Sequence, residues 1–526
     1  MAFTFQINTD VEFIHDENLL KKAEENKPVI QTRKVFPVCI AELIKDETQL
    51  NGITAKQSKK NLSQLPSYGW KRDDRLILDF GDHMVGKFEI DIDQTGSPMD
   101  APLYLRIKFA EVPSELEAES RDYNGWLSRS WIQEEFVHFD QLPAKLSLPR
   151  RYSFRYVELK IIDTSPKWQA VFSNPTVTTE TSADSSSFKP LCLKDEKLQK
   201  IYNVGIKTLA DCMQDVFEDG PKRDRRLWLG DLRLQALADY ASFDNTALVK
   251  RCLYLFAGMT TKEGKISANV FVQPKNIPDD TFLFEYSLFF ISVLYDLHQA
   301  HPNEDLGREL YPTAKKQIDL SLQMFDKDGK LIPDEDYPVF VDWSNEFNKD
   351  TAGQAEMIYV LKQFIFLAET IGEPDINFYH EKLTLISRYA REHLYRPERK
   401  LFVTGNEEFN IASQVWMVLS GVMSPEENRE IMQTTIREMF PITGIATPYM
   451  YHHIVEALFQ AGLKDDAVTL MKNYWGKMIG LGADTFWEAF DPNQPDYSPY
   501  GSPIVNSYCH AWSCTPVYLI KKYLTE

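Results

Sequence analysis

The hydrophobic periodicity of this 526-residue chain changes once, and this change constrains the fold more than any other feature. Over residues 75–177, apolar residues alternate with polar ones or run over strand lengths, at 76–80, 87–92, 103–109 and 156–162. After a Ser/Thr-rich connector at 178–187 the period becomes 3.6 and stays so to the end. The sequence therefore predicts an antiparallel β-sandwich domain at 66–187, followed by an all-α domain at 188–526.

The all-α part contains about twelve segments with helical periodicity. They are predicted at 196–218, 231–243, 245–257, 281–300, 304–325, 351–371, 375–394, 411–422, 425–439, 448–462, 464–480 and 504–523. Short links follow the even-numbered segments, whereas the links after the odd-numbered ones are mostly longer and rich in aromatic and acidic residues. In an (α/α)6 toroid of six hairpins, every odd-to-even link emerges at the same end. We therefore expect one face of the barrel to carry a functional site.

Composition narrows the class of protein. Hydrophobic residues at 43% and aromatic residues at 13% suffice for large cores, and the length predicts several domains. Residues 1–65 give only a weak signal, a short charged helix and a strand-like run, so their role stays open.

The net charge of −19 argues against nucleic acid or an anionic membrane as a partner. The N-terminus lacks a signal-peptide pattern, and no stretch approaches 18 apolar residues.

The six cysteines are scattered without the spacing of a zinc site. Cys509 and Cys514 flank His510, but a Cys-His nucleophile needs a third, orienting group. We predict a cytoplasmic protein without a metal or other cofactor, and leave open whether it forms a homo-oligomer.

The first long link holds a dense group of charges at residues 219–231 (DGPKRDRRLWLGD). It contains three carboxylates, three arginines and a tryptophan. Such charges are retained where acids and guanidinium groups position one another and a polar substrate, to which the aromatic ring offers a face. The alternative is a solvated charged turn.

Two further links carry acidic and aromatic pairs. Glu285 and Tyr286 begin a helix after the second link, as a pocket wall or as a charge favoured by the helix dipole. Asp342 and Trp343 lie in the third link. They could cap and pack, or supply a hydroxyl acceptor and a stacking plane to a sugar.

The sixth link contains Glu488 among the aromatic residues Phe486, Trp487 and Phe490. Few water molecules reach a carboxylate in such a place, so its pKa should rise, which makes it a candidate acid or base. The first and sixth hairpins become neighbours when the toroid closes. Acids of both could then face one aromatic-walled pocket, as glycosidic hydrolysis requires. His510, expected on the first half of the last helix, is either a core histidine or a partner for a sugar hydroxyl.

Several of these stretches resemble glycoside hydrolase family 78, the α-L-rhamnosidases. Residues 219–231 resemble the family motif D-C-P-x-R-D-E-R-x-G-W-x-G-D, residues 482–488 resemble G-A-T-T-x-W-E, and residues 507–512 resemble the S-x-x-H segment that follows it. Residues 81–87, 105–112 and 154–158 resemble the accessory β-domain of the family. The likeness spans about residues 70–526 in consistent order.

The first motif departs from the family pattern. Gly220 stands where the family has Cys, Arg225 stands where its general-acid Glu falls, and the motif is one residue shorter before Trp228. In the family motif, however, the general acid lies seven residues before the final Asp. Counting seven residues back from Asp231 gives Asp224. We choose Asp224, because arginine cannot donate a catalytic proton.

The resemblance implies an inverting exo-hydrolase of terminal α-L-rhamnosyl groups that needs no catalytic metal. In that scheme Asp224 protonates the leaving oxygen and Glu488 activates water. The residues expected to hold the sugar are Asp219, Arg223, Trp228, Asp231, Trp343 and His510. The alternatives are a catalytically silent sugar-binding relative, suggested by Arg225, or another toroid enzyme acting on oligosaccharides, a lyase or a phosphorylase.

Overall fold

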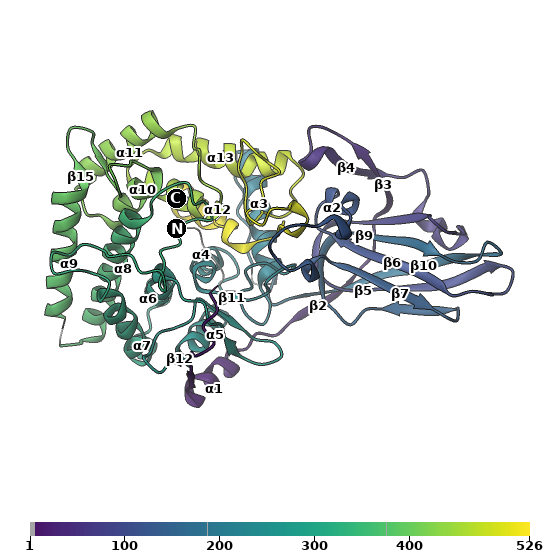
Figure 1. Cartoon of the computed structure of the whole chain (residues 1–526), viewed down its shortest axis with the longest axis horizontal. Coiled ribbons are helices and arrows are strands. Elements are labelled where there is room, and N and C mark those ends of the chain that lie inside the picture. Colours follow the sequence, from purple (N-terminus) through teal and green to yellow (C-terminus); the bar gives the residue numbers. More distant parts are fainter. Residues whose placement is uncertain (1–5, 187, 375, 526) are drawn as a thin grey trace.

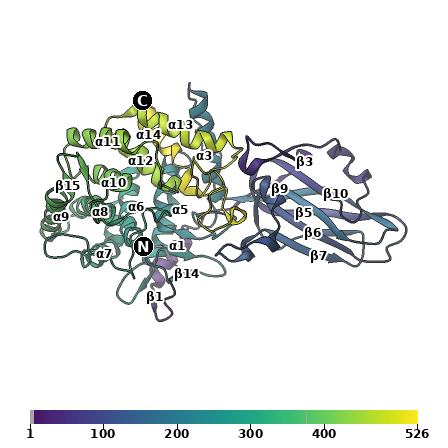
Figure 2. The ribbon, with the colours of Figure 1, turned by 45° about the horizontal axis from the view of Figure 1, so that its top comes forward.

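The computed structural model describes residues 6–186, 188–374 and 376–525. An antiparallel β-domain stands at one end of a larger helical domain, next to helix α3 (Figure 1). The view in Figure 2 shows the same arrangement. The predicted fold class is thus confirmed: a β-domain precedes a helical domain.

The β-domain is built on one long, bent strand. The strands of its sheet are β2 (Gln31–Val35), β3 (Cys39–Lys45), β4 (Ile53–Gln57), β5 (Arg75–Gly96), β6 (Leu103–Ala110), β7 (Glu134–Phe139), β8 (Ala144–Ser147), β9 (Tyr152–Asp163) and β10 (Trp168–Thr181). The main order is β2-β10-β5-β9-β6-β7, while β3 and β8 also pair with β5. The runs predicted at 76–80 and 87–92 are both parts of β5, whose pairing with β9 shifts register between Asp79 and Met84.

The N-terminal segment takes part in both domains. Strands β2, β3 and β4 belong to the sheet, which therefore begins before the boundary predicted at residue 66. Strand β1 (Phe13–His15) instead pairs with β12 (Met259–Thr261) of the helical domain, and helix α1 (Glu17–Glu25) packs on α5 (Thr246–Ala257). Arg251 of α5 donates a hydrogen bond to the carbonyl of Ala23 at 2.7 Å. The short charged helix expected in this segment is α1, at Glu17–Glu25. The pairing of β1 with β12 had no pattern in the sequence that predicts it.

The helical domain is a double ring of helices. The outer helices are α3 (Glu196–Cys212), α5, α7 (Glu304–Leu322), α9 (Asn377–Tyr389), α11 (Pro425–Met439) and α13 (Lys464–Gly480). The inner helices are α4 (Leu229–Tyr240), α6 (Phe284–Ala300), α8 (Asp350–Ile371), α10 (Ile411–Ser420), α12 (Pro448–Gln460) and α14 (Pro516–Leu524). Each inner helix contacts the next, and α14 contacts α4, so the ring closes. No helix in the described part of the chain is both long and apolar enough for a membrane span.

Two helix predictions are wrong next to the functional site, one at its C-terminal end and one at its N-terminal end. The segment predicted at 196–218 is helical only to Cys212, and a bridge between Met213 and Phe217 turns the chain. The segment predicted at 504–523 becomes α-helical only at Pro516, after two single 3-10 turns at Pro503–Val505 and Ala511–Ser513. His510 therefore precedes the last helix, in a loop whose backbone N–H groups bond to other loops, as from His510 to the carbonyl of Phe486 at 2.9 Å. The apolar residues of this loop are buried although they form no α-helix.

Candidate active site

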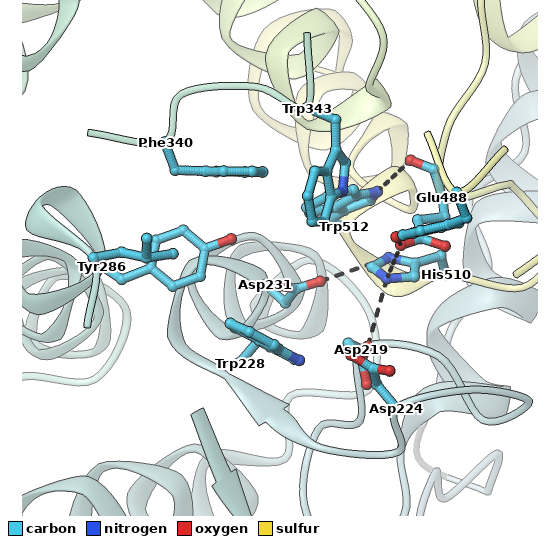
Figure 3. A pocket seen from close by; sticks show the side chains of 12 residues that line it. Asp219, Asp224, Trp228, Asp231, Tyr286, Phe340, Trp343, Glu488, His510 and Trp512 are labelled. Carbon is cyan, nitrogen blue, oxygen red and sulfur yellow. Dashed lines mark hydrogen bonds and ion pairs between the residues drawn. The ribbon is translucent and has the colours of Figure 1, made fainter. Parts of the chain in front are cut away.

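One pocket collects most of the predicted residues (Figure 3). It is lined by Asp219, Asp224, Trp228, Asp231, Leu283, Tyr286, Phe340, Trp343, Glu488, Tyr500, His510 and Trp512. All of them come from the first, second, third and sixth long links, or from the first turn of the inner helix that follows. The loop-rich face of the barrel thus carries the pocket, as predicted. Arg223 is not among the lining residues, but it bonds to Glu488.

A tight turn in the first link separates Asp224 from Arg225. Both residues have positive φ, 60° and 55°, which non-glycine residues adopt only rarely. The Arg225 amide bonds to the carbonyl of Gly220 at 3.3 Å and closes the turn. Asp224 lines the pocket, whereas burial and the neighbouring Arg151 of the β-domain lower the pKa of Arg225 to about 10. The carboxylate and not the guanidinium therefore reaches the pocket.

Gly220, where the family motif has Cys, lies in a crowded place. A Cβ atom at this position would lie 2.6 Å from the Ser507 hydroxyl oxygen and 3.2 Å from the carbonyl oxygen of Cys509. Contacts this short require a neighbour to move. The departure from the motif therefore fits the close approach of the first and sixth links, which is also visible in the bond from the Ala511 amide to the Asp219 carbonyl at 2.9 Å.

Glu488 is held by two side-chain donors. Arg223 donates to one of its carboxylate oxygens and Tyr500 to the other. The second terminal nitrogen of Arg223 lies 3.3 Å from Asp224 Oδ1, so a single guanidinium joins both predicted catalytic carboxylates. Burial raises the pKa of Glu488 above its ordinary value, while Arg223 and Tyr500 oppose the rise. The predicted direction of this shift is confirmed.

His510 lies between three carboxyl groups. Its Nε2 is 3.7 Å from Asp219 Oδ2 and 3.9 Å from Glu488 Oε1, and its Nδ1 is 3.6 Å from Asp231 Oδ1. Burial and Arg223 lower the pKa of His510 well below its usual value. Burial, together with neighbouring carboxylates, raises the pKa of Asp219 and of Asp231 well above the usual range. Burial thus favours the uncharged forms of His510, Asp219 and Asp231.

Two polar atoms of this group are ready for a ligand. Within the described residues, His510 Nδ1 and Asp231 Oδ1 are buried and have no hydrogen-bond partner. A buried polar atom without a partner is costly, because it has lost its bonds to water. A hydroxyl group in the pocket would restore those bonds.

An aromatic wall forms the opposite side. Trp228 and Tyr286 meet edge to face at 6.2 Å, Tyr286 and Phe340 at 5.9 Å, and Phe340 and Trp343 at 5.2 Å. Figure 3 shows this row of rings across the pocket from Glu488 and His510. The pocket therefore offers apolar surface on one side and hydrogen-bonding groups on the other, as sugar sites do.

Glu285 and Asp342 support the wall instead of lining the pocket. Glu285 is buried and accepts bonds from the backbone amides of Phe340 and Val341, both at 2.8 Å. Asp342 accepts from the amides of Ser344 and Ala446 and from the Thr447 hydroxyl. Asp342 therefore ties the third link to the segment before α12, but it caps neither α8, whose N-cap is Lys349, nor α12, whose N-cap is Thr447. Tyr286 and Trp343 line the pocket, as their pocket interpretations expected.

Four lining residues were missed by the sequence reasoning: Leu283, Phe340, Tyr500 and Trp512. Phe340 lies three residues before Trp343, so it could have been included with it. Tyr500 follows a Ser-Pro pair in a stretch without helical or strand periodicity. No local signal distinguishes it, although it bonds directly to Glu488.

A group with metal-binding residue types lies outside the pocket. One ligand atom each of His83, Asp211 and Cys509 lie within 4.8 Å of one another. The Lys207 ammonium donates to both carboxylate oxygens of Asp211, at 2.7 and 2.6 Å, and His83 Nδ1 lies 2.6 Å from Asp211. These bonds already use the Asp211 carboxylate, so the group is an ion-pair network and a poor fit for a metal.

Comparison with known proteins connects this geometry to a family. Residues 37–179 match the glycosyl hydrolase family 78 alpha-rhamnosidase N-terminal domain, and residues 188–524 match the bacterial alpha-L-rhamnosidase six-hairpin glycosidase domain. The chain belongs to glycoside hydrolase family 78. It is an α-L-rhamnosidase, and the resemblance seen in its motifs is confirmed.

Solved structures of this family share the architecture. A rhamnosidase from Klebsiella oxytoca with rhamnose bound is 44% identical, with a TM-score of 0.95 over 98% of this chain and 100% of that one. A family 78 rhamnosidase of a Bacillus species is 20% identical, with a TM-score of 0.71 over 85% of this chain and 46% of its own length.

The Streptomyces avermitilis α-L-rhamnosidase complexed with L-rhamnose is 15% identical, with a TM-score of 0.64 over 94% of this chain and 44% of its own. The chain thus spans about half the length of the Bacillus and Streptomyces proteins. No curated protein matches its sequence.

Proposed function

We propose that this family 78 enzyme removes terminal α-L-rhamnosyl groups with inversion, with Asp224 as general acid and Glu488 as general base. The observation that carries the assignment is the Arg223 guanidinium, which contacts both carboxylates at one pocket. Inverting hydrolysis needs an acid on the leaving oxygen and a base on a water at the opposite face of the sugar.

The surroundings of the two carboxyl groups support these roles. The Glu488 side chain is 4% exposed and accepts from two donors, which favours the ionised form that a base requires. The Asp224 side chain is 18% exposed and therefore lies nearer to solvent, where a leaving group can depart. Glu488 would take a proton from water as that water attacks the anomeric carbon. Asp224 would donate its proton to the glycosidic oxygen.

The remaining predicted residues divide into sugar-binding and positioning groups. His510 Nδ1 and Asp231 Oδ1 would bond to ring hydroxyls. The aromatic wall with Trp228 and Trp343 suits the methyl group and the apolar face of a 6-deoxy sugar. Arg223 would position Glu488 instead of contacting the sugar, and Asp219 would orient His510. The rhamnose bound in the Klebsiella protein supports rhamnose as the sugar held here.

An NMR time course tests the proposal. When an α-L-rhamnoside is hydrolysed, the β-anomer of rhamnose should appear first and then mutarotate. First appearance of the α-anomer would indicate retention and a nucleophilic Glu488. Failure to release rhamnose would favour the silent sugar-binding relative. The cytoplasmic location and the oligomeric state stay predictions.

A further inference from the structure

A segment of the β-domain reaches into the active-site loops. Residues 111–133 join β6 to β7 and include the short helix α2 (Ser114–Glu117). Glu111 accepts a bond from the Tyr508 amide at 2.6 Å, and Glu115 pairs with Lys222 of the first link. Figure 1 shows α2 beside the yellow C-terminal loop. The segment is thus anchored to both links that carry the catalytic carboxylates.

Trp126 lies at the point where this segment meets the sixth link. Its backbone amide bonds to the carbonyl of Tyr500 at 3.2 Å, and its indole N–H bonds to the carbonyl of Pro499 at 2.9 Å. The preceding Gly125 allows the approach, since a Cβ atom there would lie 2.4 Å from the carbonyl oxygen of Tyr500. The indole is therefore fixed in orientation.

Tyr500 connects Trp126 to the reaction centre. The two rings pack at 5.5 Å between centroids, and Tyr500 also meets Trp343 of the pocket wall at 5.8 Å. Tyr500 lines the pocket and donates to Glu488, whereas Trp126 is 46% exposed. Trp126 is thus the next ring outward from the pocket and continues its aromatic wall into solvent.

We propose that Trp126 forms the binding surface for the group that leaves, a pyranose or an aromatic ring attached to the rhamnosyl unit. This inference rests on the proposed function of the pocket. On that function the pocket holds the terminal sugar, so the rest of the substrate extends beyond the lining residues. A fixed, half-exposed indole offers a ring-shaped leaving group a flat apolar surface, on which sugar and aromatic faces both pack.

The Trp126→Ala variant tests the proposal with two substrates. One is an aryl α-L-rhamnoside, and the other is α-L-rhamnosyl fluoride, whose leaving group has no ring. We expect kcat/KM to fall about 3- to 10-fold for the aryl rhamnoside, mainly through KM, which is the effect of one aromatic contact. The fluoride should be hydrolysed at the wild-type rate. Trp126→Phe should recover most of the loss.

Phe136→Ala is the matched control, because Phe136 is a 52% exposed aromatic residue on β7 of the same domain. Phe136→Ala should leave kcat/KM unchanged for both substrates. An equal loss on both substrates for Trp126→Ala would show that Trp126 acts through Tyr500 and Glu488 and would overturn the inference, as would no loss on either. If the wild-type protein hydrolysed neither substrate, the proposed function itself would fail, and this inference with it.

Discussion

Asp224 and Arg225 show how the backbone of one turn decides which side chain is available for chemistry. Both have positive φ, and the turn directs the acid to the pocket and places the guanidinium near Arg151 of the β-domain. The shorter motif thus keeps a carboxyl group in the pocket although Arg225 stands where the family has its acid.

We therefore expect Asp224→Asn to lower turnover of natural α-L-rhamnosides by roughly 10²–10⁴-fold, the usual effect of removing a general acid. The loss should be far smaller on α-L-rhamnosyl fluoride, whose leaving group needs no protonation. Steady-state kinetics on both substrates measure the difference. Arg225→Gln is the control and should retain most activity on both, because its side chain does not line the pocket. Equal losses for Asp224→Asn would remove this residue from the acid role.

The pKa of Glu488 gives a second prediction at the residue scale. Burial raises this pKa, and the Tyr500 hydroxyl opposes the rise by donating to the ionised form. A general base acts only when ionised, so the acidic limb of the pH profile of kcat/KM should reflect this pKa. Tyr500→Phe should move that limb to higher pH.

Tyr123→Phe provides the comparison, because the Tyr123 hydroxyl bonds to the carbonyl of Leu127 in the same hydrophobic cluster. Its acidic limb should match the wild type. A Tyr500→Phe limb that stays in place or moves to lower pH would mean that Glu488 is not the group titrating there.

At the scale of elements, the link between α7 and α8 shows how one buried carboxylate can fix a loop. Val341 has a φ of 54°, which is strained for a β-branched residue. Glu285, in the first turn of α6, accepts hydrogen bonds from the backbone amides of Phe340 and Val341. It thereby holds the loop that contributes Phe340 and Trp343 to the pocket. The strain at Val341 is tolerated because one buried carboxyl group accepts from both amides.

Glu285→Gln should weaken this support, because an amide keeps only one acceptor oxygen and turns an N–H toward a backbone N–H. We expect a stability loss of about 1–3 kcal/mol, together with a raised KM as Trp343 shifts. Thermal unfolding and kinetics together measure both effects. Glu426→Gln is the control, because Glu426 is exposed in the first turn of α11 and tests the helix-dipole effect without any loop contact. It should change neither the stability nor KM. Equal effects of the two variants would contradict the loop-holding role.

The elements also show what the sequence could and could not predict. The order of domains, the double ring and the loop-rich face follow from periodicity and link length, because those patterns extend over many residues. The position of His510 did not follow, since residues 504–515 are buried by neighbouring loops and their apolar spacing resembles a helix. Tyr500 could not be predicted, because its role depends on contacts with Arg223, which is far away in the sequence, and with Glu488, which a stretch without periodicity separates from it.

At the scale of the whole molecule, side chains of the β-domain hold the loops that carry the proposed catalytic residues. Arg155 bonds to Asp79 of its own domain and to Asp484, four residues before Glu488. Arg151 bonds to Glu218, next to Asp219. Through these pairs the β-domain contacts both links that provide the proposed acid and base. The geometry of the pocket therefore depends on the docking of the two domains.

His83 lies at the centre of that interface. Its Nδ1 is 2.6 Å from Asp211 of α3 and its Nε2 is 3.1 Å from Glu111. Burial lowers the pKa of His83, but Cys509, Asp211 and Glu111 raise it, and the net result is well above the usual value. The shift favours the imidazolium form of His83, which would join carboxylates of both domains.

The sign of the pH dependence follows from linkage. Because the folded pKa of His83 exceeds the unfolded value of about 6.5, its stabilising contribution is complete below that pH and is lost as the pH rises through the folded pKa. The Tm difference between the wild type and His83→Gln should therefore be largest between about pH 5 and 6.5, where the partner carboxylates are still ionised, and should shrink in alkaline solution. His380→Gln, which removes an exposed histidine near Glu369, should show no such trend. A His83→Gln difference that is constant or grows with pH would mean that the imidazole is neutral in the folded protein, and that the domains are held by the neighbouring arginine pairs instead.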